Sequence, residues 1–370
     1  MANPRMGSIS LQQPLGIGTL QWGTTWIDEK MVKGGRISDA TVHSIVGECL
    51  RAGVTFFDSA EGYGGGTSEE RLGRAALGCQ AALATKFLPT FWRCWRGAFQ
   101  SAVLRSRAGL QVAKIPLYFI HTPVHWLPVE FWIEAACDAK DEGLIENIGV
   151  SNFDADQVIR AHVVASRRGH AIAANQVMFG LLNYKNVRLQ ETLRVCHELG
   201  IAIVAFSPIG QGLLTDRFSS DGFSSNRVAK MTGVRLNDLE RLRGEMHAVA
   251  KETGKSMAQI ALNWVICHDC IPLIGCRSLQ QAQDTLGALG WRLNDEHIRR
   301  LDEVALGHST LTGKRWKRVF FCQCVWLGHG LLSISSMAQR QLTLLGAFQW
   351  TRAKRWATDL TTCQMIGRLE

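Results

Sequence analysis

The sequence predicts a (β/α)8 TIM barrel with an irregular C-terminal extension, and three observations support this fold class. The 370 residues are 46% hydrophobic and 20% charged, so the chain can bury one large core. Short apolar runs alternate with longer helical patterns through eight successive units. A doubly wound sheet is the alternative, but the segment GIGTLQWG leads into a loop and lacks the glycine fingerprint of that fold.

The strands are expected at eight short apolar runs that lie between helical patterns. Their order, with a helix after each strand, is what a parallel barrel requires. The expected strands are residues 15–20, 54–58, 81–86, 115–120, 147–150, 172–176, 201–206 and 271–274.

Helical patterns follow the strands, and several begin at a start signal such as Ser38 with Asp39 or Asn237 with Asp238. Others end at a glycine that can serve as a C-cap. The expected helices are 38–52, 68–77, 96–107, 129–142, 154–168, 187–199, 237–253 with 256–266, and 278–289. The expected closing glycines are Gly53, Gly143, Gly169 and Gly200.

The alternation stops near residue 306, so we expect a barrel over residues 1–310 and a basic tail of unknown structure over 311–370. The tail holds nine Lys and Arg against two acidic residues, which is seven of the nine net positive charges. The barrel is therefore nearly neutral, and no nucleic-acid partner is expected for it. Four interpretations of the tail stay open. They are a solvated extension, a segment that contacts phosphates or a membrane surface, a segment that wraps the barrel mouth, and an aberrant end of the reading frame.

The cysteine content and the search for targeting signals bear on the cellular compartment. Eleven cysteines scattered through helices and strands suit reduced thiols better than a disulfide framework. Cys267 and Cys270 have the spacing of a zinc or redox pair, but no second pair accompanies them, so no metal is expected. No targeting peptide is evident, and the apolar run 319–334 is too short for a spanning helix. We expect a cytoplasmic protein without a membrane span.

Polar residues stand where the expected strands end, and in a barrel these ends meet at one mouth. Asp58 ends the second strand with Tyr63 in the next turn, Lys86 ends the third, and His121 follows the fourth. Later strands run into Ser151, Asn152, Asn175, Gln176, Ser207 and the segment Gly275-Cys276-Arg277. Taken singly, each residue also has a structural interpretation, such as a turn cap, a solvated lysine or a packing side chain. Their joint placement favours an active site.

The chemistry that this set supports is proton delivery to a carbonyl oxygen. A tyrosine has a reference pKa of ~10, so an adjacent ammonium is needed to stabilise its phenolate at neutral pH. Lys86 could supply this charge, Asp58 could hold the lysine, and His121 could position the substrate oxygen. The glycines from residue 62 to residue 66 let the backbone bend so that the phenol faces the mouth.

Seven segments resemble the aldo-keto reductase family in the order in which that family has them, over about residues 6 to 305. FFDSAEGYG, LATKF, LYFIHTP and GLIENIGVSNF are similar to its catalytic and signature blocks. NQVMFGLLN, AFSPIGQGLLT and IPLIGCRSLQQAQDTLGAL are similar to its cofactor segments. Two further stretches, ALNWVICHDCIPLIG and GALGWRL, look most like plant and algal reductases of the pyridoxal reductase type.

The resemblance implies NADPH-dependent reduction of an aldehyde or ketone to an alcohol by hydride transfer. It makes Tyr63 the proton donor in a tetrad with Asp58, Lys86 and His121. The small-molecule carbonyl substrate is not identified. An NADPH-binding regulatory subunit with little turnover, using the basic tail to bind a partner, is the alternative.

The resemblance also implies a set of cofactor-binding residues. Ser151, Asn152 and Gln176 match positions that bind the nicotinamide carboxamide, and Phe206 replaces the usual stacking tyrosine. Residues that match the pyrophosphate clasp are Ser207, Gly210, Gln211, Gly212 and Leu213. Residues that match the adenosine site are Gly275, Arg277, Ser278 and Gln281, among which Arg277 and Ser278 favour a 2′-phosphate and hence NADPH.

Four tryptophans of the expected mouth loops could line an apolar substrate pocket or pack within the protein. They are Trp22, Trp26, Trp92 and Trp126. Thr285 stands where an Asn commonly meets the adenine, which weakens that expected contact. The oligomeric state is not predicted.

Overall fold

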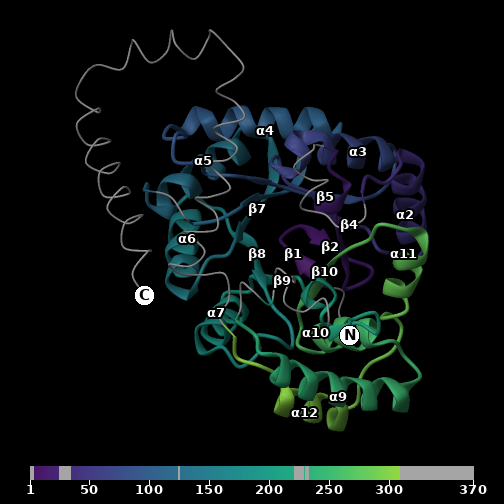
Figure 1. Ribbon diagram of the computed structural model, residues 1–370. Helices are drawn as coiled ribbons and strands as arrows, with labels where there is room; N and C mark the ends of the chain where they lie inside the picture. Colours follow the sequence, from purple (N-terminus) through teal and green to yellow (C-terminus); the bar gives the residue numbers. More distant parts are fainter. Residues whose placement is uncertain (1–3, 25–34, 124–125, 221–228, 230–232, 309–370) are drawn as a thin grey trace, which may run out of the picture. The chain divides into compact units, whose positions relative to one another are not determined.

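The computed structural model describes residues 4–24, 35–123, 126–220, 229 and 233–308, which contain a closed barrel of eight parallel strands (Figure 1). All eight expected strands are present, in the hydrogen-bonded order β10-β3-β4-β5-β6-β7-β8-β9. Their bounds are β3 Gly16–Gly18, β4 Phe56–Asp58, β5 Ala82–Phe87, β6 Ile115–Ile120, β7 Ile145–Ser151, β8 Ile172–Met178, β9 Ala202–Phe206 and β10 Ile271–Gly275. The expected tail, residues 311–370, lies outside the described residues.

Helices surround the strands on their outer side, as Figure 1 shows. The α-helices are α2 Asp39–Arg51, α3 Thr67–Ala75, α4 Arg96–Leu110, α5 Val129–Asp141, α6 Ala155–Arg167, α7 Val187–Glu198, α9 Leu236–Thr253, α10 Met257–Cys267, α11 Leu279–Leu286 and α12 Asp295–Val304. The described residues also form the short 3-10 helices η1 Leu20–Trp22, η2 Tyr63–Gly66 and η3 Gly210–Gly212. The four glycines expected to close helices all have positive φ, between 66° and 79°. Within the described residues, no helix combines the length and the apolarity needed to cross a bilayer.

A hairpin and one α-helix were not expected from the sequence. A hairpin of β1 Arg5–Met6 and β2 Ile9–Ser10 lies at the amino-terminal end of the barrel, where the main chain of Ser8 donates to Oδ1 of Asn147 at 3.1 Å. Helix α12 follows the last barrel unit and begins at an Asn294 cap, whose Oδ1 accepts from the N–H of His297. The hairpin fills the opening at the amino-terminal end of the barrel, because Met6 belongs to the same buried cluster as the strand residues that point into the barrel.

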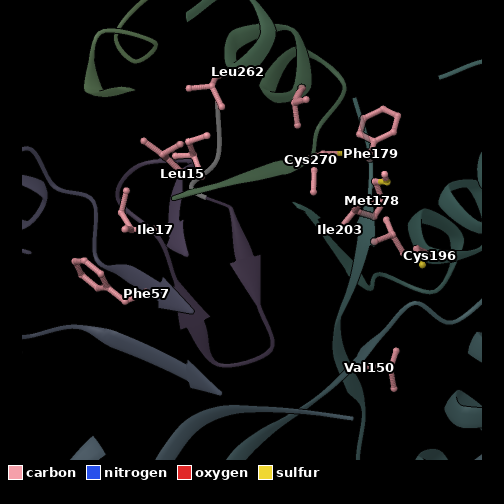
Figure 2. Packing of buried hydrophobic residues seen from close by; sticks show 14 of the residues in the cluster. Leu15, Ile17, Phe57, Val150, Met178, Phe179, Cys196, Ile203, Leu262 and Cys270 are labelled. Carbon is pink, nitrogen blue, oxygen red and sulfur yellow. The ribbon is translucent and has the colours of Figure 1, made fainter. Parts of the chain in front are cut away.

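Buried apolar side chains form two layers, one inside the barrel and one between the strands and the helices. Phe56 belongs to the inner layer and its neighbour Phe57 to the outer one, because successive residues of a strand point to opposite sides. Figure 2 shows part of the outer layer, with Ile17, Phe57 and Ile203 on the strands and Leu262 on α10. The alternation therefore decides which residues at the strand ends face the barrel interior.

The described cysteines are free thiols, and burial raises the pKa of several of them. Cys270 is buried and its Sγ donates to the carbonyl of His268 at 3.2 Å, while Cys267 Sγ donates to Oδ1 of Asn263 at 3.5 Å. Among the described residues, no group of three His, Cys, Asp or Glu lies close enough together to hold a metal ion.

Candidate active site

A buried ion pair between Lys86 and Asp58 lies at the carboxyl end of the barrel interior. Lys86 follows Ala84 by two residues on β5 and therefore points inward, as does Asp58 two residues after Phe56 on β4. The ammonium contacts Oδ2 of Asp58 and donates to the main-chain oxygen of Ser59 at 2.6 Å. The two side chains are only 0% and 2% exposed, so each charge depends on the other.

The contacts around this pair favour its charged state. Burial by itself lowers the pKa of Lys86, but the nearby Asp58 and Tyr63 outweigh burial and raise that pKa above its ordinary value. Burial raises the pKa of Asp58, while Lys86 and a hydrogen bond from Nε2 of Gln176 at 3.1 Å oppose the rise. The raised pKa of Lys86 favours a charged pair, whereas the raised pKa of Asp58 favours a neutral one. We assign a charged pair, because the ammonium is held by two oxygens and the carboxylate by two donors.

Tyr63 reaches this pair from a glycine-rich turn. Gly64 and Gly65 have φ of 61° and 60°, a left-handed conformation that other residues rarely adopt. A Cβ added to Gly64 would also lie 2.7 Å from the Cα of Gly23. The turn brings the Tyr63 ring over the lysine, with Nζ of Lys86 5.1 Å from the ring centroid. The phenol thus lies beside a fixed positive charge.

His121 completes the group at the end of β6. Its ring centroid is 6.0 Å from that of Tyr63, and the two rings meet edge to face at 79°. Burial, and then the charge of Lys86, lowers the pKa of His121 to about 3. The imidazole is therefore neutral at pH 7 and can donate one hydrogen bond from a ring nitrogen.

Ser151, Asn152 and Gln176 lie side by side, because Ser151 of β7 is in register with Gln176 of β8. Ser151 Oγ donates to the main-chain oxygen of Gln176 at 3.0 Å, and Asn152 Nδ2 donates to the main-chain oxygen of His121 at 3.1 Å. No described residue donates to the amide oxygens of Asn152 and Gln176. The two oxygens can therefore accept from a carboxamide such as that of nicotinamide, so these residues fit the cofactor.

The loop after β9 carries the residues expected at the pyrophosphate. Phe206 is half-buried at the strand end, where its ring can stack on a flat group. Ser207, Gln211 and Gly212 all have positive φ, at 56°, 54° and 97°. A left-handed backbone of this kind can turn N–H groups toward an anion. Gly210 is also left-handed, and a Cβ there would lie 2.5 Å from Leu182 Cδ1.

Arg243 of α9 anchors this loop, and sequence reasoning missed it. Its Nη1 donates to the main-chain oxygens of Leu213 at 2.6 Å and Thr215 at 2.8 Å. Its guanidinium lies 4.5 Å from the ring centroid of Phe218. No local signal distinguishes Arg243 from the exposed Arg241 of the same helix, because its partners lie about 30 residues earlier in the chain.

The segment after β10 carries the residues expected at the adenosine. Gly275 is exposed, and the main-chain N–H of Arg277 donates to Oε1 of Gln281 at 2.8 Å. Ser278 caps α11 by accepting from the N–H of Gln281 at 3.2 Å. Nη2 of Arg277 donates to the main-chain oxygen of Gly35, whereas its buried Nη1 has no hydrogen-bond partner among the described residues. A phosphate oxygen could use this donor, so the site also fits the 2′-phosphate.

The tryptophans of the mouth loops have different surroundings. Trp22 is fully buried and its Nε1 donates to the main-chain oxygen of Cys276 at 2.9 Å, so it packs within the protein and does not line a surface pocket. Trp92 and Trp126 are 41% and 65% exposed. The indole of Trp126 donates to the main-chain oxygen of Phe91 at 2.9 Å. Trp26 lies outside the described residues.

Comparisons with known proteins identify the family and the fold of the chain. The chain is 32% identical over 313 residues to the chloroplastic pyridoxal reductase of Arabidopsis thaliana, covering 80% of this chain and 84% of that one. A glycerol dehydrogenase from Gluconobacter oxydans has the same fold, with a TM-score of 0.69, 24% identity and coverage of 82% of this chain and 94% of that chain. An aldo-keto reductase from Bacillus halodurans gives 0.67 at 24% identity, covering 83% and 97%. The Aldo/keto reductase family model matches residues 14–306, and the chain therefore belongs to that family of oxidoreductases.

Proposed function

We propose that the protein reduces an aldehyde or ketone to an alcohol with NADPH, and that Tyr63 is the proton donor. The observation that carries this proposal is the position of the Tyr63 phenol beside the buried ammonium of Lys86. Asp58 and His121 lie at the same end of the barrel. An acid, a fixed positive charge and a neutral imidazole are the groups that carbonyl reduction requires.

The lysine makes the phenol a stronger acid. Tyrosine has a pKa of ~10, and each unit by which it falls corresponds to about 1.4 kcal/mol of differential interaction. The ammonium of Lys86 stabilises the phenolate that remains after Tyr63 gives its proton to the carbonyl oxygen. Asp58 keeps this ammonium charged and oriented, so the charge is in place before the proton moves.

His121 positions the substrate. Because its pKa is lowered to about 3, the imidazole carries no charge at pH 7 and does not repel the ammonium of Lys86. Its ring N–H can donate to the carbonyl oxygen while the Tyr63 phenol, whose ring is 6.0 Å away, donates to the same oxygen. Two donors on one oxygen fix the carbonyl and polarise it.

NADPH, when bound, supplies the hydride that reduces the carbonyl carbon. Ser151, Asn152 and Gln176 would hold its carboxamide, with Phe206 against the ring. The loop of Ser207, Gly210, Gln211, Gly212 and Leu213 would hold the pyrophosphate. The adenosine end would meet Gly275, Arg277, Ser278 and Gln281, and the free donor of Arg277 favours the 2′-phosphate of NADPH over NADH.

An aromatic aldehyde is the substrate class to test first. The Arabidopsis relative is named a pyridoxal reductase. In this chain Phe91 and Trp92 are exposed on the loop after Lys86, with ring centroids 4.7 Å apart, and Trp126 follows His121. Flat apolar side chains of this kind suit a flat ring by stacking. No observation on the described residues favours a regulatory subunit instead.

The test is to follow NADPH oxidation with a panel of aldehydes and ketones that includes pyridoxal. We expect the protein to turn over at least one of them, and Tyr63→Phe to lower kcat roughly 10²- to 10⁴-fold, the usual contribution of a general acid. The variant should bind NADPH as the native protein does, because Tyr63 holds no part of it. If the native protein never exceeds Tyr63→Phe on any compound, the proposal is wrong.

A further inference from the structure

Glu61 lies in the turn between Asp58 and Tyr63, yet it has no part in the reaction proposed above. Its side chain is only 12% exposed, and Oε1 accepts from the main-chain N–H of Leu88 at 2.7 Å. Its own N–H donates to the main-chain oxygen of Lys86 at 3.3 Å. Glu61 therefore binds the main chain on both sides of Phe87, at the end of the strand that carries the lysine.

The carboxylate of Glu61 also forms a two-pronged pair with Arg93. Nη1 of Arg93 donates to Oε1 and Nη2 donates to Oε2, the latter at 3.1 Å. The same guanidinium donates to the main-chain oxygen of Leu88 at 3.0 Å and lies 5.0 Å from the ring centroid of Phe87. A bidentate arginine and carboxylate pair with both partners mostly buried fixes orientation as well as distance.

The turn that holds Tyr63 needs such an anchor. Beyond Tyr63 it consists of three glycines, Gly64, Gly65 and Gly66, which have many backbone conformations to choose from. The acidity of the phenol depends on its distance from the ammonium. At an effective dielectric of about 20, moving two unit charges from ~4 to ~6 Å apart weakens their attraction. The loss corresponds to about a tenfold change in an ionisation constant, which is about one pKa unit.

We propose that Glu61 and Arg93 are a positioning pair that sets the separation of the Tyr63 phenol and the Lys86 ammonium, and with it the acidity of the proton donor. The pair joins the turn of the phenol directly to the strand end of the lysine. It also fixes the loop that presents Phe91 and Trp92. This inference rests on the proposed role of Tyr63, but its central measurement needs neither substrate nor cofactor.

The measurement is the ionisation of Tyr63 in the full-length protein, followed by NMR of tyrosine labelled with carbon-13 at Cζ. The chain has only three tyrosines, so three signals are expected, and Tyr63→Phe identifies the one of interest. Tyr118 is buried and Tyr184 contacts Asp302, and both pKa values are raised, which keeps their titrations away from that of Tyr63.

Two variants alter the pair without changing the net charge. Glu61→Gln with Arg93→Met removes both charges, and Arg93→Lys keeps the charge but loses the two-pronged geometry. We expect the pKa of Tyr63 to rise by about one unit in the double variant and by less in Arg93→Lys. In turnover assays kcat should fall about tenfold and its pH profile should move by the same amount, whereas the KM of the carbonyl substrate should change less than twofold.

Arg105→Gln is the matched control. Its Nη2 lies 3.7 Å from Oε2 of Glu61, but its side chain is 61% exposed and makes no hydrogen bond to the loop after Lys86 in the described structure. The titration of Tyr63 should not change in this variant. If both pair variants lose thermal stability but leave the pKa of Tyr63 unchanged, the pair is merely structural and the inference is wrong. That outcome differs from failure of the proposed function, in which the native protein itself shows no turnover.

Discussion

At the scale of single residues, the proposed proton donor Tyr63 lies among charges that other side chains keep in place. Asp58 holds Lys86 on one side, and the amide of Gln176 holds Asp58 on the other by donating to Oδ1 at 3.1 Å. The same amide is proposed to face the nicotinamide carboxamide. Under this proposal Gln176 links the cofactor site to the ion pair, and a change in its orientation would alter both.

The charge of His121 gives a prediction about stability. Its pKa is about 3 in the folded protein and ~6.5 in an unfolded chain, so between these values the unfolded state binds more protons. The free energy of unfolding must then fall as the pH falls below 6.5. We expect the native protein to lose roughly 1.5 to 2 kcal/mol more than His121→Gln between pH 6.5 and 5, measured by urea unfolding. Identical pH dependence in both proteins would mean that His121 titrates normally when folded.

At the scale of elements, two of the loops at the mouth are held by an arginine from a neighbouring helix. Arg71 of α3 is one example, since its guanidinium donates to the main-chain oxygens of Trp22 and Ile37 and to Asp39. Arg243 of α9 does the same for the loop after β9. Long side chains on the helices thus give irregular loops fixed hydrogen-bond partners.

The arginine that anchors the loop after β9 gives a second prediction. Arg243→Met removes both bonds to the oxygens of Leu213 and Thr215 but keeps most of the side-chain volume. The loop must then be ordered when NADPH binds, and we expect the Kd of NADPH to rise roughly 30-fold, since two lost hydrogen bonds at about 1 kcal/mol each amount to about 2 kcal/mol. Quenching of tryptophan fluorescence measures this Kd.

Arg241→Met, on the same helix, is the control for that prediction. Arg241 is exposed, so its replacement should leave the Kd unchanged. The KM of the carbonyl substrate should also stay within twofold in Arg243→Met, because the loop is proposed to hold only the cofactor. An unchanged Kd in Arg243→Met would show that the loop keeps its shape without the arginine.

The hydrophobic pattern of the sequence predicted the eight strands, because each strand is a short apolar run between helical segments. It also placed Asp58 and Lys86 at strand ends, where alternation turns them inward. The hairpin of β1 and β2 was missed because strands of two residues have no period to detect. The contacts of Glu61, Arg93 and Arg243 join residues about 30 positions apart, and no local pattern encodes a pairing of that kind.

At the scale of the whole molecule, the described barrel is complete without the basic tail. Pairing of β10 with β3 closes the sheet. The last described residues are fixed to the barrel, since the N–H of Leu306 donates to the oxygen of Leu181 at 2.8 Å and that of His308 to the oxygen of Leu182 at 3.3 Å. The closed sheet and its helices therefore form a unit with its own core.

We therefore propose that residues 1–310 form an independent domain, and this predicts the behaviour of a chain that ends at residue 310. Removing residues 311–370 takes away seven of the nine net positive charges, so the shorter chain should elute from a cation exchanger at much lower salt. Its thermal unfolding should stay cooperative and its Tm should change by no more than about 4 °C, which corresponds to about 1 kcal/mol or somewhat more for a domain of this size. NADPH should bind with the same Kd, because every proposed contact lies before residue 310. A large loss of Tm or of NADPH binding would show instead that the tail is part of the barrel's stable structure.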